Sequence, residues 1–241
     1  MQYFGGIGDF VKFALLRHLM KDRRLAVCCY LPGGNCKARV PERHFDYLKR
    51  REDFRPLAPE VFDGLEHIVT SVHAISDPVI ALQISEVLKG AFFVRAEVPK
   101  RTSERLAWGG RLVQSVGDAN LVFLDPHHGI EGRRLTPGHV ALAEIAPLRQ
   151  RARALIIGHQ QSGRRAEAKF LADRMRSLGC NPVEIVRFRL GMSRFYVISD
   201  HDDAMSDLIA VFVGASPSTS ESRATAKGAG GQERGRRCPE A

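Results

Sequence analysis

An acidic residue and two imidazoles follow directly on an apolar run near the middle of the chain. Residues 122–124 (Val-Phe-Leu) are typical of a buried central strand, and Asp125-Pro126-His127-His128-Gly129 comes next. Pro126 has no amide hydrogen to give to a sheet, so the strand must end there. Ligands and reacting groups collect at the carboxyl ends of strands in open α/β sheets. We therefore predict that the Asp125–His128 segment belongs to the functional site.

Hydrophobic periodicity indicates the elements that position this segment. Short apolar runs predict strands, and apolar residues at helical spacing predict helices. Strands are expected at 25–31, 91–94, 121–124, 154–157, 183–189 and 195–199, and helices at 10–22, 59–69, 77–88, 103–116, 137–150 and 164–178. Asp9 is placed to cap the first helix, and Glu97 falls just past the second strand.

The order of these elements defines the expected fold class. Strands that alternate with helices predict an α/β fold, in which a mostly parallel sheet is covered on both faces. The turn at 190–193 joins the last two strands as an antiparallel hairpin. The expected architecture is a mixed, doubly wound sheet with this C-terminal hairpin, in a single domain of residues 1–213.

Residues 214–241 differ in composition from the rest of the chain. They consist mainly of Ser, Thr, Gly, Ala, Arg and Lys, and such a segment cannot bury enough apolar surface to offset the entropy of ordering. We expect a disordered basic tail. The whole chain has a formal charge of +9, of which the five basic and three acidic tail residues carry +2. The body keeps +7, which permits an anionic partner such as nucleic acid but also fits a basic surface without such a task.

Location and metal content are predicted from what the chain lacks. No apolar run approaches the roughly 20 residues that cross a bilayer, and the first residues have neither the basic start nor the apolar core of a signal peptide. We expect a cytoplasmic protein without a membrane partner. Its five cysteines have no regular spacing, which argues against both a disulfide scaffold and a zinc site.

The segment after the third expected strand resembles a known motif. A parallel sheet with an antiparallel strand near its C-terminal end resembles the Rossmann-like fold of S-adenosylmethionine-dependent methyltransferases, whose amino-methyltransferases carry Asp/Asn-Pro-Pro-Tyr/Phe after the fourth strand. Asp125-Pro126-His127-His128 is similar, with histidines in the last two places. In that family the first side chain and a backbone carbonyl accept hydrogen bonds from the target amine, and the aromatic ring stacks on the flipped base. The resemblance implies catalytic roles for Asp125, Pro126, His127 and His128.

Most of the body, residues 3–198, resembles the bacterial adenine-N6 methyltransferases that act on 23S rRNA. Residues 5–12 look like that family's Gly-Asn-His-Ala-Asp-Val-Leu-Lys helix start, residues 76–81 like its Gly-Ser-Pro-Leu-Ile-Ala segment, and residues 191–193 like its final Gly-Met turn. The opening also resembles a group of bacterial and phage proteins with a Gly-Asp-Ile-Gly-Asp-Phe start. The rRNA family implies an RNA substrate more than DNA. It also implies that Gly33, Gly34, Asn35, Asp77 and Glu97 hold S-adenosylmethionine and that Tyr3 and Lys12 contact the substrate.

Departures from that family keep other functions open. No carboxylate follows the first strand at Tyr30-Leu31-Pro32. Glu97 and Leu121 are only 24 positions apart, which leaves little room for a third strand with its helix. Both points favour an alternative, a catalytically degenerate methyltransferase fold that serves as a binding or accessory module in a phage or mobile-element system. A third possibility is a metal-dependent hydrolase that would use Asp125, His127, His128, Glu131 and His159.

Each candidate residue also has a purely structural explanation. Asp125-Pro126 is a common turn initiator, and Glu97 could be a solvated acid at a strand end. Gly5, Gly6 and Gly8 precede a helix without a preceding strand, so they are a helix entry rather than a dinucleotide fingerprint. His159, beyond the next strand, fits a structural role.

Overall fold

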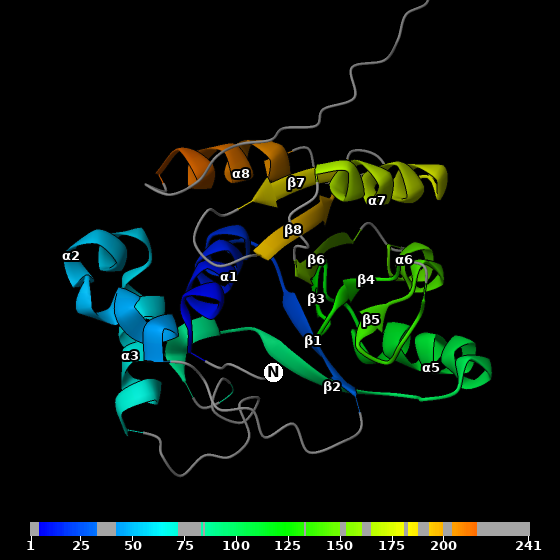
Figure 1. Ribbon diagram of the computed structural model, residues 1–241, viewed down its shortest axis with the longest axis horizontal. Helices are drawn as coiled ribbons and strands as arrows, with labels where there is room; N and C mark the ends of the chain where they lie inside the picture. Colours follow the sequence, from blue (N-terminus) through cyan, green and yellow to red (C-terminus); the bar gives the residue numbers. More distant parts are fainter. Residues whose placement is uncertain are drawn as a thin grey trace, which may run out of the picture.

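A six-stranded sheet forms the centre of the computed structural model (Figure 1). The structure describes residues 5–32, 42–71, 83, 85–132, 134–149, 153–160, 165–180, 183–187, 193–199 and 204–215. The strands follow the order β2-β1-β3-β6-β8-β7 across the sheet. Their bounds are β1 Leu25–Pro32, β2 Phe92–Val98, β3 Leu121–Asp125, β6 Ala154–Gln160, β7 Val183–Arg187 and β8 Ser193–Ile198.

The strand directions make this a Rossmann-like, mostly parallel sheet. β1 pairs in parallel with β2 and β3, and β3 pairs in parallel with β6. β8 is antiparallel to both β6 and β7, between which it is inserted. The doubly wound sheet with a closing antiparallel hairpin is thereby confirmed. Residues 99–120 contain α5 (Thr102–Ser115) and no strand, so β2 is the edge of the sheet on that side.

The chain reverses its winding direction next to β1. From β1 it passes to β2 on one side and then crosses back to β3 on the other. In doubly wound sheets, ligands bind in the crevice outside the carboxyl ends of the strands at such a switch point. The carboxyl end of β3, which is Asp125, lies at this position beside Cys29 of β1.

Helices cover both faces of the sheet with separate hydrophobic clusters. One face packs against α1 (Ile7–Leu19), α3 (Pro59–Ser71) and α8 (Ala204–Ala215), and the other against α5, α6 (Leu142–Leu148) and α7 (Arg165–Ser177). Shorter helical pieces complete the α1 side: η1 Glu42–Lys49, α2 Arg51–Phe54, η2 Arg55–Leu57 and η3 Glu86–Leu88. A two-residue pair, β4 (Gly129–Ile130) with β5 (His139–Val140), follows β3.

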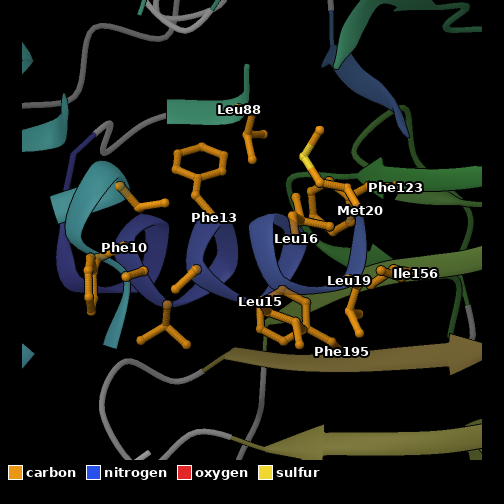
Figure 2. Packing of buried hydrophobic residues seen from close by; sticks show 14 of the residues in the cluster. Phe10, Phe13, Leu15, Leu16, Leu19, Met20, Leu88, Phe123, Ile156 and Phe195 are labelled. Carbon is orange, nitrogen blue, oxygen red and sulfur yellow. The ribbon is translucent and has the colours of Figure 1, made fainter. Parts of the chain in front are cut away.

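Helix α1 is buried on most of its circumference, which explains its apolar composition. Figure 2 shows its side chains packed between the sheet residues Phe123, Ile156 and Phe195 and, on another side, Leu88. At its start, Phe10 stacks on Tyr47 at 5.3 Å between ring centroids. The helix therefore has a fixed position above the sheet, and any polar side chain on it that faces the sheet is also fixed.

Several predicted boundaries were wrong for identifiable reasons. Helix α1 begins at Ile7 after Gly6, and Asp9 is not its N-cap but lies within the first turn. Strand β2 continues to Val98 because residues up to that point pair with β1, so Glu97 lies inside the strand rather than past its end. The helix predicted at 137–150 begins only at Leu142, since 139–140 form β5.

The end of the described chain was not predicted. Helix α8 runs to Ala215 and so extends two residues beyond the expected domain boundary. Most of the helix predicted at 77–88 and the tail from 216 onwards lie outside the described residues. None of the helices in the described ranges is long and apolar enough to cross a membrane.

Candidate active site

A buried ion triad links helix α1 to the carboxyl end of β3. The Lys12 ammonium lies 2.7 Å from Asp9 Oδ1 and 3.1 Å from Asp125 Oδ2. The three side chains are only 9%, 11% and 14% exposed, respectively. Asp9 Oδ2 also accepts a hydrogen bond of 2.8 Å from the Gly5 backbone N–H. Two carboxylates thus share one ammonium, and α1 holds Asp125 in a defined orientation.

The two oxygens of the Asp125 carboxylate have different surroundings. Oδ2 accepts from Lys12, whereas Oδ1 has no hydrogen-bond partner in the part of the chain that the structure describes. Gly158 of β6 lies beside Oδ1, at a point where a Cβ atom would be 3.8 Å away. Because residue 158 is a glycine, no side chain from this position lies against Oδ1. Asp125 can therefore accept a hydrogen bond from a ligand through Oδ1.

The pKa values of the neighbouring groups agree with a concentrated charge at this point. Burial alone lowers the pKa of Lys12, but the negative charges of Asp125 and Asp9 outweigh burial and raise it above the ordinary value. Burial, followed by the charge of Asp125, raises the pKa of Cys29 to about 12. Lys12 is thus a cation and Cys29 a neutral thiol at physiological pH.

The segment after Asp125 brings several imidazoles together at the surface. Pro126 is buried, His127 is half-buried and His128 is exposed. The His127 and His128 ring centroids lie 4.6 Å apart, and the His139 ring lies 5.2 Å from His128. The His128 backbone N–H donates to Gly138 at 2.7 Å, which fixes the course of the loop.

Two of these imidazoles are neutral at pH 7. Burial, and then the charge of His128, lowers the pKa of His127 below its usual value. Burial, His128 and Arg105 lower the pKa of His139 in the same way. A neutral imidazole can accept a proton or a hydrogen bond.

A second buried ion pair anchors this loop from beneath. Arg105 of α5 lies 2.5 Å from Glu144 of α6 and also donates to the carbonyl of His139 at 2.5 Å. Glu144 in turn accepts from the Tyr30 hydroxyl at 3.0 Å and from the Ala141 N–H at 3.0 Å. Because this network satisfies every member, it holds the loop that carries the imidazoles rigidly.

Of the remaining predicted site residues, Lys12 and Glu97 lie in the described ranges. Lys12 is not exposed, and its ammonium binds the two acids. Glu97 is exposed on the edge strand and pairs with Leu31, so β1 separates it from Asp125. The other predicted cofactor and substrate residues lie outside the described residues: Tyr3, Gly33, Gly34, Asn35 and Asp77. Their roles stay predictions.

The residues named for a metal-dependent hydrolase do not converge. Asp125 faces α1, whereas His159 lies on the strand position that faces the other side, with its Nδ1 accepting from the Ile130 N–H at 3.1 Å. No cluster of three His, Cys, Asp or Glu side chains that could hold a metal occurs within the described ranges. His159, 7% exposed, has a structural role beneath β4.

Comparison with known proteins shows similarity at the level of structure. No protein-family model and no curated protein sequence matches the chain. The chain is similar to human methyltransferase-like protein 13, solved in complex with SAH. The two are 11% identical, the match covers 84% of this chain and 88% of that one, and the TM-score is 0.37. The fold assignment rests on the strand order and directions described above.

Sequence reasoning named Asp125 and Lys12 but missed the contact between them and the part played by Asp9. The role of Asp9 was not recognised, although an acid three residues before Lys12 on a helix is a standard ion-pair spacing. The Arg105–Glu144 pair and the gap left by Gly158 depend on tertiary contacts that no local pattern contains.

Proposed function

We propose that this protein is an S-adenosylmethionine-dependent amino-methyltransferase that acts on the exocyclic amine of adenine in a nucleic acid, with RNA favoured over DNA. The observation that supports it most is the Asp125 carboxylate at the switch point of the sheet, with Oδ2 held by Lys12 and Oδ1 open. A carboxylate oxygen without a partner is suited to accept a hydrogen bond from an amine.

The residues of this chain would orient the amine rather than activate it by strong acid-base chemistry. When bound, S-adenosylmethionine supplies an electrophilic methyl group. Asp125 Oδ1 accepts an N–H from the target amine, which aims the nitrogen lone pair away from the carboxylate and lowers the entropic cost of the reactive geometry. Lys12 acts through Asp125 as a positioning residue. His128 is exposed beside the site and would stack on the base or take up the released proton.

The described residues are compatible with a cofactor at the end of β1. Glu97 presents an exposed carboxylate on the neighbouring strand and lies in register with Leu31. Carboxylates at such positions accept hydrogen bonds from ribose hydroxyls in nucleotide-binding sheets. Glu97 is the residue in the described ranges that we assign to this task.

A direct test separates binding from transfer. The full chain is titrated with S-adenosylmethionine by calorimetry, and transfer of a labelled methyl group to unmodified single-stranded RNA and DNA is then measured. We expect Asp125→Ala to lose at least about 100-fold in transfer, in line with the loss of one positioned contact, while cofactor affinity changes little. Asp173→Ala, an exposed acid on α7, is the matched control. Full transfer by Asp125→Ala would overturn the proposed role.

A binding or accessory module is the second candidate. The observation that favours it is the end of β1, where Tyr30 is buried and donates to Glu144 and no carboxylate follows in the described part of the strand. The same calorimetric titration decides between the two. Failure of S-adenosylmethionine to bind at millimolar concentration would favour the accessory module.

A further inference from the structure

A row of three basic side chains crosses the second half of the sheet near its carboxyl edge. Arg194 of β8 pairs directly with His159 of β6 on one side and with Arg187 of β7 on the other. Directly paired residues on neighbouring strands point to the same face. Tyr196, two residues after Arg194, belongs to the hydrophobic cluster with α7, so the row faces the α7 side of the sheet.

The two guanidinium groups in this row have no acidic partner among the described residues. Arg194 is 2% exposed, and its buried Nη1 has no hydrogen-bond partner in the part of the chain that the structure describes. The buried Nε of the half-buried Arg187 also has none, and neither arginine forms an ion pair within the described residues. Like charges directly opposite each other on paired strands repel, and burying an unpaired charge is costly. This arrangement is unfavourable unless an anion completes it.

Two of the other strongly buried cations in the described ranges have carboxylate partners, unlike this pair. Lys12 has Asp9 and Asp125, and Arg105 has Glu144. Arg153 donates from its Nε to the carbonyl of Ala119 at 2.9 Å. Arg194 and Arg187 have no such carboxylate or carbonyl partner within the described ranges, and they lie at the edge of the sheet where ligands bind.

We propose that Arg194 and Arg187 form a binding site for a phosphate-type oxyanion. Planar guanidinium groups with free N–H donors match phosphate oxygens in charge and geometry. We identify the oxyanion as a backbone phosphate of the nucleic acid next to the target base, and this identification rests on the proposed function. Strand spacing places Arg194 two strands, roughly 10 Å, from Asp125. Because Asp125 faces α1 and the row faces α7, the bound strand would cross the carboxyl edge of the sheet.

The first experiment measures stabilisation of the full chain by inorganic phosphate at constant ionic strength, with chloride as the reference. At ten times the dissociation constant, phosphate should raise the thermal midpoint of the wild type by about 3–6 °C. Arg194→Met should remove this shift while its midpoint in chloride is unchanged or higher, since an unpaired buried charge is lost. Arg111→Gln, an exposed arginine on α5, removes the same charge and should keep the shift.

Further variants keep the inference falsifiable. If Arg194→Met does not fold, Arg187→Gln at the half-buried neighbour should still reduce the phosphate shift by at least half. Equal phosphate shifts in the wild type and in the folded arginine variants would overturn the site. So would the absence of any shift in the wild type.

The last experiment distinguishes free phosphate from nucleic acid as the ligand of this site. It also distinguishes a failure of this inference from a failure of the proposed function. Binding of a labelled single-stranded RNA should weaken at least tenfold in Arg194→Met, more than in Arg111→Gln. If RNA affinity is unchanged while the phosphate shift is lost, the site takes free phosphate and the nucleic-acid identification is wrong. Arginine-dependent RNA binding without S-adenosylmethionine binding would retain the site and refute the methyltransferase proposal.

Discussion

Replacing Lys12 by methionine should strongly destabilise the folded protein. The substitution leaves the carboxylates of Asp9 and Asp125 facing each other without the ammonium that lies 2.7 and 3.1 Å from them. Both acids are nearly buried, and loss of one partner from a buried ionic group costs about 3–5 kcal/mol. For a chain of this size that corresponds to a fall in thermal midpoint of roughly 6–20 °C.

Chemical unfolding of Lys12→Met at pH 7.5 tests the electrostatic explanation. Adding Asp9→Asn to Lys12→Met should recover part of the stability, as expected of coupled residues. The exposed Lys21→Met is the matched control. A loss under about 1 kcal/mol at pH 7.5, within the range of ordinary surface substitutions, would refute this reasoning.

Three further predictions concern the rest of the site. Gly158→Ala should fold, since its methyl group would meet neighbours at 3.5 Å or more, and circular dichroism checks this point. The methyl group would also cover the open oxygen of Asp125, so the kcat/KM of methyl transfer should fall. Gly129→Ala should destabilise by about 2 kcal/mol or more, because φ is +92° and the new Cβ would overlap the His159 ring; urea unfolding measures this. The pKa values of His127 and His139 are lowered in the folded state, so the unfolded chain takes up more protons than the folded protein below pH 6.5. The free energy of unfolding should therefore fall as the pH drops from 7.5 to 5.5. It should fall less steeply in a His127→Asn/His139→Asn variant.

The strongest local patterns predicted the fold correctly. The apolar runs at β1, β3 and β6 are buried on both faces, and a continuous run is the pattern of a central parallel strand. Edge strand β2 was predicted too short because its second half alternates exposed and buried residues, and Arg95 and Glu97 resemble the start of a loop. Helix α8 was missed because its apolar run has little polar face, a pattern that fits either a helix or a strand.

The candidate site was predictable only where a local rule applies. Asp125 follows from a proline that ends a buried strand, which depends on neighbours in the sequence. Its link to Lys12 joins residues 113 positions apart, and no periodicity contains that contact. The pairing of Arg187 with Arg194 likewise depends on the register of the hairpin, which one residue of slip would change completely.

The position of α8 against α1 has a consequence for how the chain is made. Helix α1 leaves the ribosome well before α8, which contacts it and is the last described element. His18 of α1 bonds the carbonyl of Leu208 at 2.9 Å and packs on Phe212. At about 5–20 residues per second, roughly 10–40 s pass between the synthesis of the two helices. During that time the side of α1 that α8 covers stays without this partner, so the contact between the first and the last described helix forms only after nearly all of the described chain has been made.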